Sequence, residues 1–312
     1  MGWTGLTLAR IGLIALLAAS CGGRPEPPPT GLLVVSDADD LYVVGADGSG
    51  RRALVGAPGP QLDADWSPDG GRVAYRDSPH GVNVDDEISV VAADGSGAEN
   101  VTRNPANDWS PAWSPDGHRI AFASDREGEL RIFVMAPDGS GVRRLTEIWG
   151  EYPAWSPDGE QVAFASYAGS TGPSGEPDYD LFVVNADGSG LRRLTESPAY
   201  DMYPTWSPDG ERIAFESTRD TPEGFEPPAR DRERTADFDV FVVDADGSGE
   251  PKNFSNDLDR LQKFPDWSPD GRWIAVDEEG TVAFVPADGS GSIRRLEGAA
   301  LRGGFPAWAP AG

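Results

Sequence analysis

The sequence predicts an all-β fold, a β-propeller of six blades in which each blade is a sheet of four antiparallel strands. Two recurring turn motifs support this prediction. The first, Trp-Ser-Pro-Asp-Gly, occurs in near-identical form at five tryptophans and in altered form at a sixth: Trp66, Trp113, Trp155, Trp206, Trp267 and, as WAPAG, Trp308. The second, Asp-Gly-Ser-Gly, begins at Asp47, Asp94, Asp138, Asp187, Asp246 and Asp288. Internal repeats of this length are typical of propellers, solenoids and arrays.

The segments between the motifs have the composition of β-strands. RIAFAS, from Arg119 to Ser124, alternates apolar with small or polar residues, and LFVVNAD, from Leu181 to Asp187, is rich in branched and aromatic residues. One repeat is therefore strand A around Pro-Ala-Trp, the Ser-Pro-Asp-Gly turn, strand B, a connection, strand C, the Asp-Gly-Ser-Gly turn and a short strand D such as Arg192 to Thr195. Four such antiparallel strands form one propeller blade.

Both motifs have structural explanations. Proline presets the first central angle of a type I turn, aspartate tolerates the second, and glycine takes the position beyond. We expect each repeated tryptophan to fill the space between adjacent blades, because its ring covers more area than any other side chain. The motifs therefore indicate architecture and not catalysis.

The two ends of the repeat region predict how the ring closes. Strands B, C and D are present before Trp66 without a strand A ahead of them, whereas the last eight residues, Phe305 to Gly312, form a strand A with nothing after it. We expect the C-terminal strand to pair with the strand near Leu33. This pairing completes the sixth blade and removes two exposed sheet edges.

The first twenty residues are typical of a bacterial lipoprotein signal. Arg10 precedes an apolar run from Ile11 to Ala19, and small residues stand directly before Cys21. The run is too short to span a bilayer as a mature helix. We expect three segments: a signal peptide over 1–20, a lipidated Cys21 with a Pro-rich tether over 21–30, and the propeller over 31–312. A plain secretory signal with an unrelated cysteine is the alternative.

This assignment predicts that the protein is exported. It would be lipid-anchored to the cell membrane or outer membrane, facing the periplasm or the cell exterior, because several acyl chains on one cysteine hold a protein at a bilayer more firmly than a single chain.

The charge of the chain narrows the possible partners. With 52 acidic and 26 basic residues the pI is near 4.3, whereas nucleic acids and anionic lipid headgroups are bound by clustered Lys and Arg. We therefore expect no nucleic-acid binding. The acidic surface serves solubility, or it attracts cations or a basic partner.

Where PAWSPDG, RIAFAS, FVVNADGSG and LRRLT align, the sequence resembles the TolB-type six-bladed β-propeller family, with its WD40-like or PD40 repeat. The resemblance extends over about residues 31 to 312. TolB is a periplasmic propeller that partners an envelope lipoprotein and translocating toxins. The resemblance implies a non-enzymatic module, without cofactor and monomeric, that docks a protein or peptide of the cell envelope.

Loop lengths indicate which face carries the docking surface. The spacing from each repeated Trp to the next marker Asp, which contains the B–C connection, varies between 21 and 40 residues, whereas the spacing from marker Asp to Trp varies only between 17 and 21. Loops that vary in length are where binding residues tend to occur. The two largest insertions, residues 166–180 and 217–239, are either solvated loops or a lip over one side of the ring.

Residues just before the repeated tryptophans, in the expected D–A loops, should approach the mouth of the central channel on the same face. The candidates for a binding surface are Asp108, Trp109, Glu151, Tyr152, Asp201, Tyr203 and Lys263. Asp108 and Asp201, five residues before their Trp, are the favoured functional pair. For Tyr152, Tyr203 and Phe264, three residues before their Trp, packing between blades is the favoured role.

Catalytic motifs are absent from the sequence. It contains two histidines and one cysteine, and neither a G-x-S-x-G elbow nor an H-E-x-x-H pair. We therefore expect no enzyme and no bound metal. The alternative is a propeller-type polysaccharide lyase or hydrolase that uses carboxylates at the channel mouth, and calcium binding by paired carboxylates such as Asp37 and Asp39 also stays open.

Overall fold

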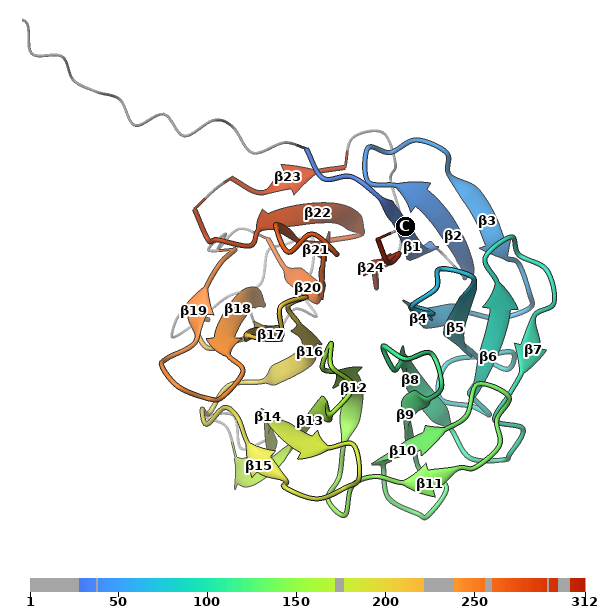
Figure 1. The fold of residues 1–312 in the computed structure, drawn as a ribbon, viewed down its shortest axis with the longest axis horizontal. Helices are drawn as coiled ribbons and strands as arrows, with labels where there is room; N and C mark the ends of the chain where they lie inside the picture. The colour runs from blue at the N-terminus through green and yellow to red at the C-terminus, as the bar shows by residue number, and fades with distance from the viewer. Residues whose placement is uncertain are drawn as a thin grey trace, which may run out of the picture.

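The computed structural model describes residues 28–37, 39–171, 177–221, 238–255, 260–290, 292–296 and 304–311. Figure 1 shows six sheets around a central axis. Every secondary-structure element assigned within these ranges is a β-strand, and each sheet contains four antiparallel strands. The six-bladed β-propeller predicted from the repeats is confirmed.

The blades are numbered here in chain order. Blade 1 contains β1 (Leu32–Asp37), β2 (Asp40–Gly45), β3 (Arg52–Val55) and β24 (Ala307–Trp308). Blade 2 contains β4 (Gln61–Trp66), β5 (Arg72–Asp77), β6 (Glu87–Ala92) and β7 (Glu99–Asn100). Blade 3 contains β8 (Asp108–Trp113), β9 (Ile120–Ser124), β10 (Arg131–Met135) and β11 (Arg143–Arg144).

The second half of the ring repeats this order. Blade 4 contains β12 (Glu151–Trp155), β13 (Gln161–Thr171), β14 (Pro177–Asn185) and β15 (Arg192–Arg193). Blade 5 contains β16 (Asp201–Trp206), β17 (Arg212–Ser217), β18 (Asp239–Asp244) and β19 (Lys252–Asn253). Blade 6 contains β20 (Gln262–Trp267), β21 (Trp273–Glu278), β22 (Thr281–Pro286) and β23 (Arg294–Arg295). In every blade strand A lies nearest the axis, and in blade 1 this strand is β24 (Figure 1).

The ring closes as expected. β24 pairs antiparallel with β1, with Trp308 opposite Leu33 and Ala307 opposite Val34. The Ala309 backbone N–H also donates to the Leu32 carbonyl oxygen at 2.8 Å. β24 thus supplies the innermost strand of blade 1, and its pairing leaves β1 inside the sheet and not at an exposed edge.

The hydrophobic core is divided into six clusters, one at each interface between neighbouring blades. Each cluster contains one repeated tryptophan, and all six tryptophans are buried. Trp206, for example, packs among Leu181 and Val183 of blade 4 and Phe215 of blade 5. The packing role predicted for the repeated tryptophans is confirmed.

The Ser-Pro-Asp-Gly turns are closed by their own side chains. In the first of them, the Ser67 hydroxyl donates to the Asp69 carboxylate at 2.6 Å and accepts from the Arg72 backbone N–H at 2.9 Å. Gly70 follows with φ of 67°, a conformation that glycine adopts without steric cost. The motif therefore needs each of its polar residues to make the turn.

One feature of the innermost strands does not follow from simple alternation. In β16, Met202 lies opposite Glu216 and Thr205 lies opposite Ala214, so three steps along β16 match two along β17. This is a β-bulge, and β4, β8, β12 and β20 contain the same register shift. The residue three before each repeated Trp has a φ between 49° and 60° in all six blades: Asp63, Ser110, Tyr152, Tyr203, Phe264 and Phe305. We call these six residues the bulge ring.

In the described part of the chain, no helix is long and apolar enough to cross a membrane. The expected signal peptide and the lipidation candidate Cys21 lie outside the described residues. Most of the 217–239 insertion also lies outside them, whereas much of the 166–180 insertion extends the hairpin of β13 and β14.

Candidate functional site

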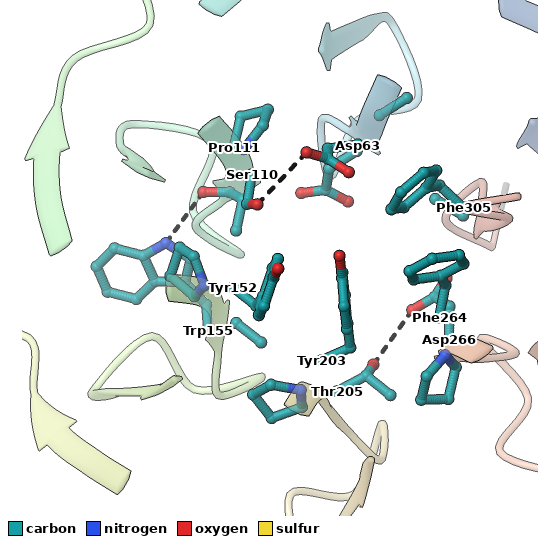
Figure 2. A pocket seen from close by; sticks show the side chains of 18 of the residues that line it. Asp63, Ser110, Pro111, Tyr152, Trp155, Tyr203, Thr205, Phe264, Asp266 and Phe305 are labelled. Carbon is teal, nitrogen blue, oxygen red and sulfur yellow. Dashed lines mark hydrogen bonds between the residues drawn. The ribbon is translucent and has the colours of Figure 1, made fainter. Parts of the chain in front are cut away.

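A cavity of about 310 Å³ lies on the axis, where the innermost strands meet. All six members of the bulge ring line it, and Figure 2 shows their side chains around the central space. The prolines that follow five of them, and the residues directly before the repeated tryptophans, complete the wall. These six positions, five of which lie at β-bulges, thus present one side chain from each blade to the channel.

The bulge ring is chemically divided into two sides. Tyr152, Tyr203, Phe264 and Phe305, from blades 4, 5, 6 and 1, form a continuous aromatic arc. Their ring centroids follow one another at 3.7 Å, 4.7 Å and 3.9 Å. Asp63 and Ser110, from blades 2 and 3, form the polar side across the cavity (Figure 2).

The packing role favoured for Tyr152, Tyr203 and Phe264 is only part of what they do. Each ring contacts the ring of the next blade, so these residues do pack between blades. The contacts lie at the channel wall, however, and the same rings line the cavity. The β-bulge explains why these rings both pack between blades and line the cavity. It directs toward the axis a side chain that simple alternation would not place there.

On the polar side, Asp63 belongs to a charged group shared by blades 2 and 3. Arg76 binds the Asp86 carboxylate at 2.6 Å, and the Trp109 indole N–H donates to the same oxygen at 2.6 Å. Arg76 lies 3.7 Å from the nearer Asp63 oxygen. Ser110 Oγ is 3.5 Å from that oxygen, which makes it at most a weak donor. Burial raises the pKa of Asp63, and the Arg76 charge only partly opposes this.

Two further carboxyl groups lie in the cavity wall directly before repeated tryptophans. Asp65 accepts a hydrogen bond from the Trp113 backbone N–H at 2.6 Å, and Asp266 accepts one from the Trp308 backbone N–H at 2.7 Å. Each bond crosses to the next blade. Burial raises the pKa of both groups to about 7, and the charge of Asp266 adds to the shift of Asp65.

Glu151 is the first residue of β12 and Lys263 is the second residue of β20. Both therefore lie at the end of their strand that faces the D–A and B–C connections. Burial raises the pKa of Glu151 to about 7, with Asp63 adding to the shift. Glu216, buried beside the Phe264 backbone N–H, also has a pKa raised to about 7, mainly by burial and partly opposed by Lys263.

The favoured pair, Asp108 and Asp201, is fully buried. Both oxygens of Asp108 bind Arg126 at 2.9 Å and 3.0 Å. Asp201 binds Arg219 and Ser217 at 2.5 Å and 2.6 Å. Burial raises the pKa of Asp201, and Arg219 opposes it. The structure thus places both aspartates in ion pairs that join an inner strand to the following B–C connection, away from the cavity wall.

The other candidates lie within innermost strands, and none of them lies in a D–A loop. Trp109, Glu151 and Lys263 are half-buried residues within inner strands, and Tyr203 lines the cavity. Sequence reasoning missed Asp63, Ser110 and Phe305. Aligning all six repeats on the tryptophan would have placed them in one column with Tyr152, Tyr203 and Phe264.

The described carboxyl groups around the channel are not clustered as metal ligands are. Nowhere in the residues that the structure describes do three His, Cys, Asp or Glu side chains converge closely enough to hold a metal ion. The site instead combines isolated, desolvated carboxyl groups with aromatic surface, an arrangement suited to recognising a ligand by charge and shape.

The comparisons with known proteins agree with this fold. TolB from Acinetobacter baumannii superimposes with a TM-score of 0.66 at 21% identity, over 90% of this chain and 67% of that chain. A protein assigned as TolB from Agrobacterium tumefaciens gives a TM-score of 0.58 at 23% identity, over 85% and 90%. A chain of a nidogen/laminin complex gives 0.67 at 11% identity, over 89% and 98%.

No curated protein matches the sequence. The family model described as the TolB beta propeller domain matches residues 36–152 and 149–224, which together make up more than half of the chain. The protein therefore belongs to the TolB β-propeller domain family.

Proposed function

We propose that the protein is a non-catalytic binding module that docks an envelope protein or peptide at the channel mouth, on the face of the long connections. The bulge ring carries this proposal. Its aromatic arc is concave, desolvated and faced by polar groups, which is the chemistry of binding hot spots. Structures that resemble this chain are of TolB proteins, which supports a binding role.

The surroundings of the mouth extend the proposed surface. On the hairpin of β13 and β14, Tyr167 and Tyr179 pack against Trp149, with ring centroids 4.2 Å and 5.4 Å from it. Tyr167 is 39% exposed. Trp149 stands two residues before Glu151, the first residue of β12, so this aromatic cluster lies beside the start of the innermost strand of blade 4. A docked partner would contact both the cluster and the channel.

The proposal includes a lipid anchor on Cys21 and an exported location. Replacing Cys21 by serine should move the protein from the membrane fraction to the soluble fraction, with folding unchanged. Membrane retention of the Cys21→Ser variant would contradict the anchor and leave the docking proposal in place.

A hydrolase or lyase is the second candidate, and one observation favours it. Glu151 and Glu216 both have a pKa raised to about 7, where a carboxyl group can serve as a general acid. Burial explains both shifts without catalysis, so we favour binding. Turnover of envelope glycans that is lost in Glu151→Gln would favour the enzyme.

Site-specific photo-cross-linking in the native envelope tests the docking proposal. A photoreactive residue at Trp109 or Lys263 probes the mouth, and one at Ser96, an exposed residue of a C–D turn, is the matched control on the opposite face. We expect one discrete adduct from both mouth positions and none from Ser96. Equal adducts from all three positions, or none from any, would contradict docking at the mouth.

A further inference from the structure

The two sides of the bulge ring suggest what chemical group the cavity accepts. Asp63 points into the cavity with its side chain only 7% exposed (Figure 2). Its Oδ1 has no hydrogen-bond partner in the structure. This oxygen has almost no exposed surface of its own. A buried carboxylate that lacks a donor to one oxygen is costly, so a positive charge in the cavity beside Asp63 would be favoured.

The neighbouring cation does not satisfy Asp63. Arg76 lies 3.7 Å from the other oxygen, Oδ2, and donates instead to Asp86, which is completely buried. Arg76 therefore forms its close ion pair with Asp86, and the negative charge of Asp63 at the cavity wall is only partly compensated.

The opposite side of the cavity suits the rest of such a cationic group. The aromatic arc offers apolar ring surface for an alkyl chain, and aromatic rings also attract a positively charged group. Asp65 and Asp266, which lie in the same wall, disfavour an anionic ligand. A positive charge at the end of an apolar stem matches both sides at once.

We propose that the channel cavity binds an alkyl-linked ammonium or guanidinium group, with its charge at Asp63 and its stem against the aromatic arc. This inference rests on the proposed function, because it names the group that a docked partner would insert. A lysine or arginine side chain of a peptide and a free small amine share this chemistry.

Isothermal titration of the full-length protein tests the inference. The probes are N-acetyl-arginine methylamide, N-acetyl-lysine methylamide and agmatine, and the neutral control is N-acetyl-citrulline methylamide, which has nearly the shape of the arginine probe. We expect the cationic probes to bind at least about tenfold more tightly than citrulline, because a charged hydrogen bond replaces a neutral one. Equal affinity for arginine and citrulline probes would overturn the proposal.

Variants locate the binding site. Asp63→Asn should weaken binding of the arginine probe by roughly tenfold to a hundredfold. Asp94→Asn removes the same charge from an exposed turn on the face away from the mouth, and should change binding by less than about twofold. Phe305→Leu removes an aromatic face and should weaken binding several-fold. Unchanged affinity in Asp63→Asn would overturn the proposal.

Stability separates a ligand-binding role of Asp63 from a structural one. If Asp63 serves ligand binding and does not stabilise the fold, the Asp63→Asn variant should unfold at the same temperature as the parent or at a higher one. The reason is that the substitution removes a buried charge that has no close partner. A large drop in the unfolding temperature would show that its contact with Arg76 holds the fold, and would overturn the proposal.

The probes also distinguish the source of the cation. Tighter binding of the capped amino acids than of agmatine indicates a partner side chain, and the reverse order indicates a free amine; both support the cation site. Probe binding without mouth-specific cross-links would contradict the proposed docking alone. Mouth-specific cross-links without probe binding would contradict this inference alone.

Discussion

Asp266 provides the sharpest test of the electrostatics of the channel. Its carboxylate joins three blades, since it accepts from the Trp308 backbone N–H of blade 1 at 2.7 Å and from the Thr205 hydroxyl of blade 5 at 3.2 Å. Burial raises its pKa from 3.8 to about 7. Asp266→Asn keeps an acceptor for the backbone N–H and removes the charge. We expect this variant to be more stable than the parent at alkaline pH.

The magnitude follows from the shift in the pKa. Because the folded-state pKa lies above the unfolded value, the folded protein holds an extra proton between about pH 4 and pH 7 and loses stability as the pH rises through that window. At about 1.4 kcal/mol per unit of pKa, the penalty removed by Asp266→Asn is about 1.5 kcal/mol at pH 5 and about 4 kcal/mol at pH 8. The gain in the free energy of unfolding should therefore grow by about 2.5 kcal/mol between these pH values.

Urea unfolding followed by tryptophan fluorescence measures this difference, since the buried repeated tryptophans report on the blade interfaces. Asp94→Asn is the control, because Asp94 is exposed and hydrogen bonds within its own turn lower its pKa. Its effect should not increase from pH 5 to pH 8. If Asp266→Asn destabilises the protein equally at both pH values, the carboxylate contributes by its hydrogen bonds and the reasoning is refuted.

Three further predictions concern the fold. Trp308→Ala should cost about 3–5 kcal/mol in the free energy of unfolding, because it empties the interface at which the ring closes; a urea titration measures the loss. In a double-mutant cycle, Arg126→Met should cost about 3–5 kcal/mol because it leaves the buried Asp108 carboxylate without its cation, Asp108→Ala should cost less because Arg126 is only half-buried, and the double variant should cost less than the sum of the two. Gly117→Ala should lower the unfolding temperature, because its φ is 70° and an added Cβ would meet Pro68 Cγ at 3.3 Å.

Much of the fold could be predicted because its determinants are local and repeated. The Ser-Pro-Asp-Gly turn closes through contacts between residues at most five apart, such as Ser67 and Arg72. The strands alternate as antiparallel strands must. Even the non-local pairing of β24 with β1 followed from counting strands. The N-terminal blade lacks a strand A and the C-terminal strand A lacks a blade, so pairing the two completes the ring.

The site could not be predicted in the same way because it depends on the bulge. A β-bulge inserts one residue that alternation does not reveal, so the side-chain direction of Tyr152 and Tyr203 was not readable from the pattern. Asp63 was further hidden because alanine, not proline, follows it. Asp108 was predicted as a binding residue for another reason. Its partner Arg126 lies 18 residues downstream, and the sequence does not show that this arginine already binds the carboxylate.

The backbone at the bulge ring indicates why these six side chains are present. All six residues have φ between 49° and 60°, a region in which glycine is stable and in which other residues cost about 1–3 kcal/mol each. Glycine is abundant in this chain, yet none of the six positions contains it. Their residue types range from aspartate and serine to tyrosine and phenylalanine, so the bulge itself does not require a particular side chain. These strained positions contain no glycine in any blade, and their side chains differ from blade to blade. We infer that the side chains are present for the surface that they form in the channel.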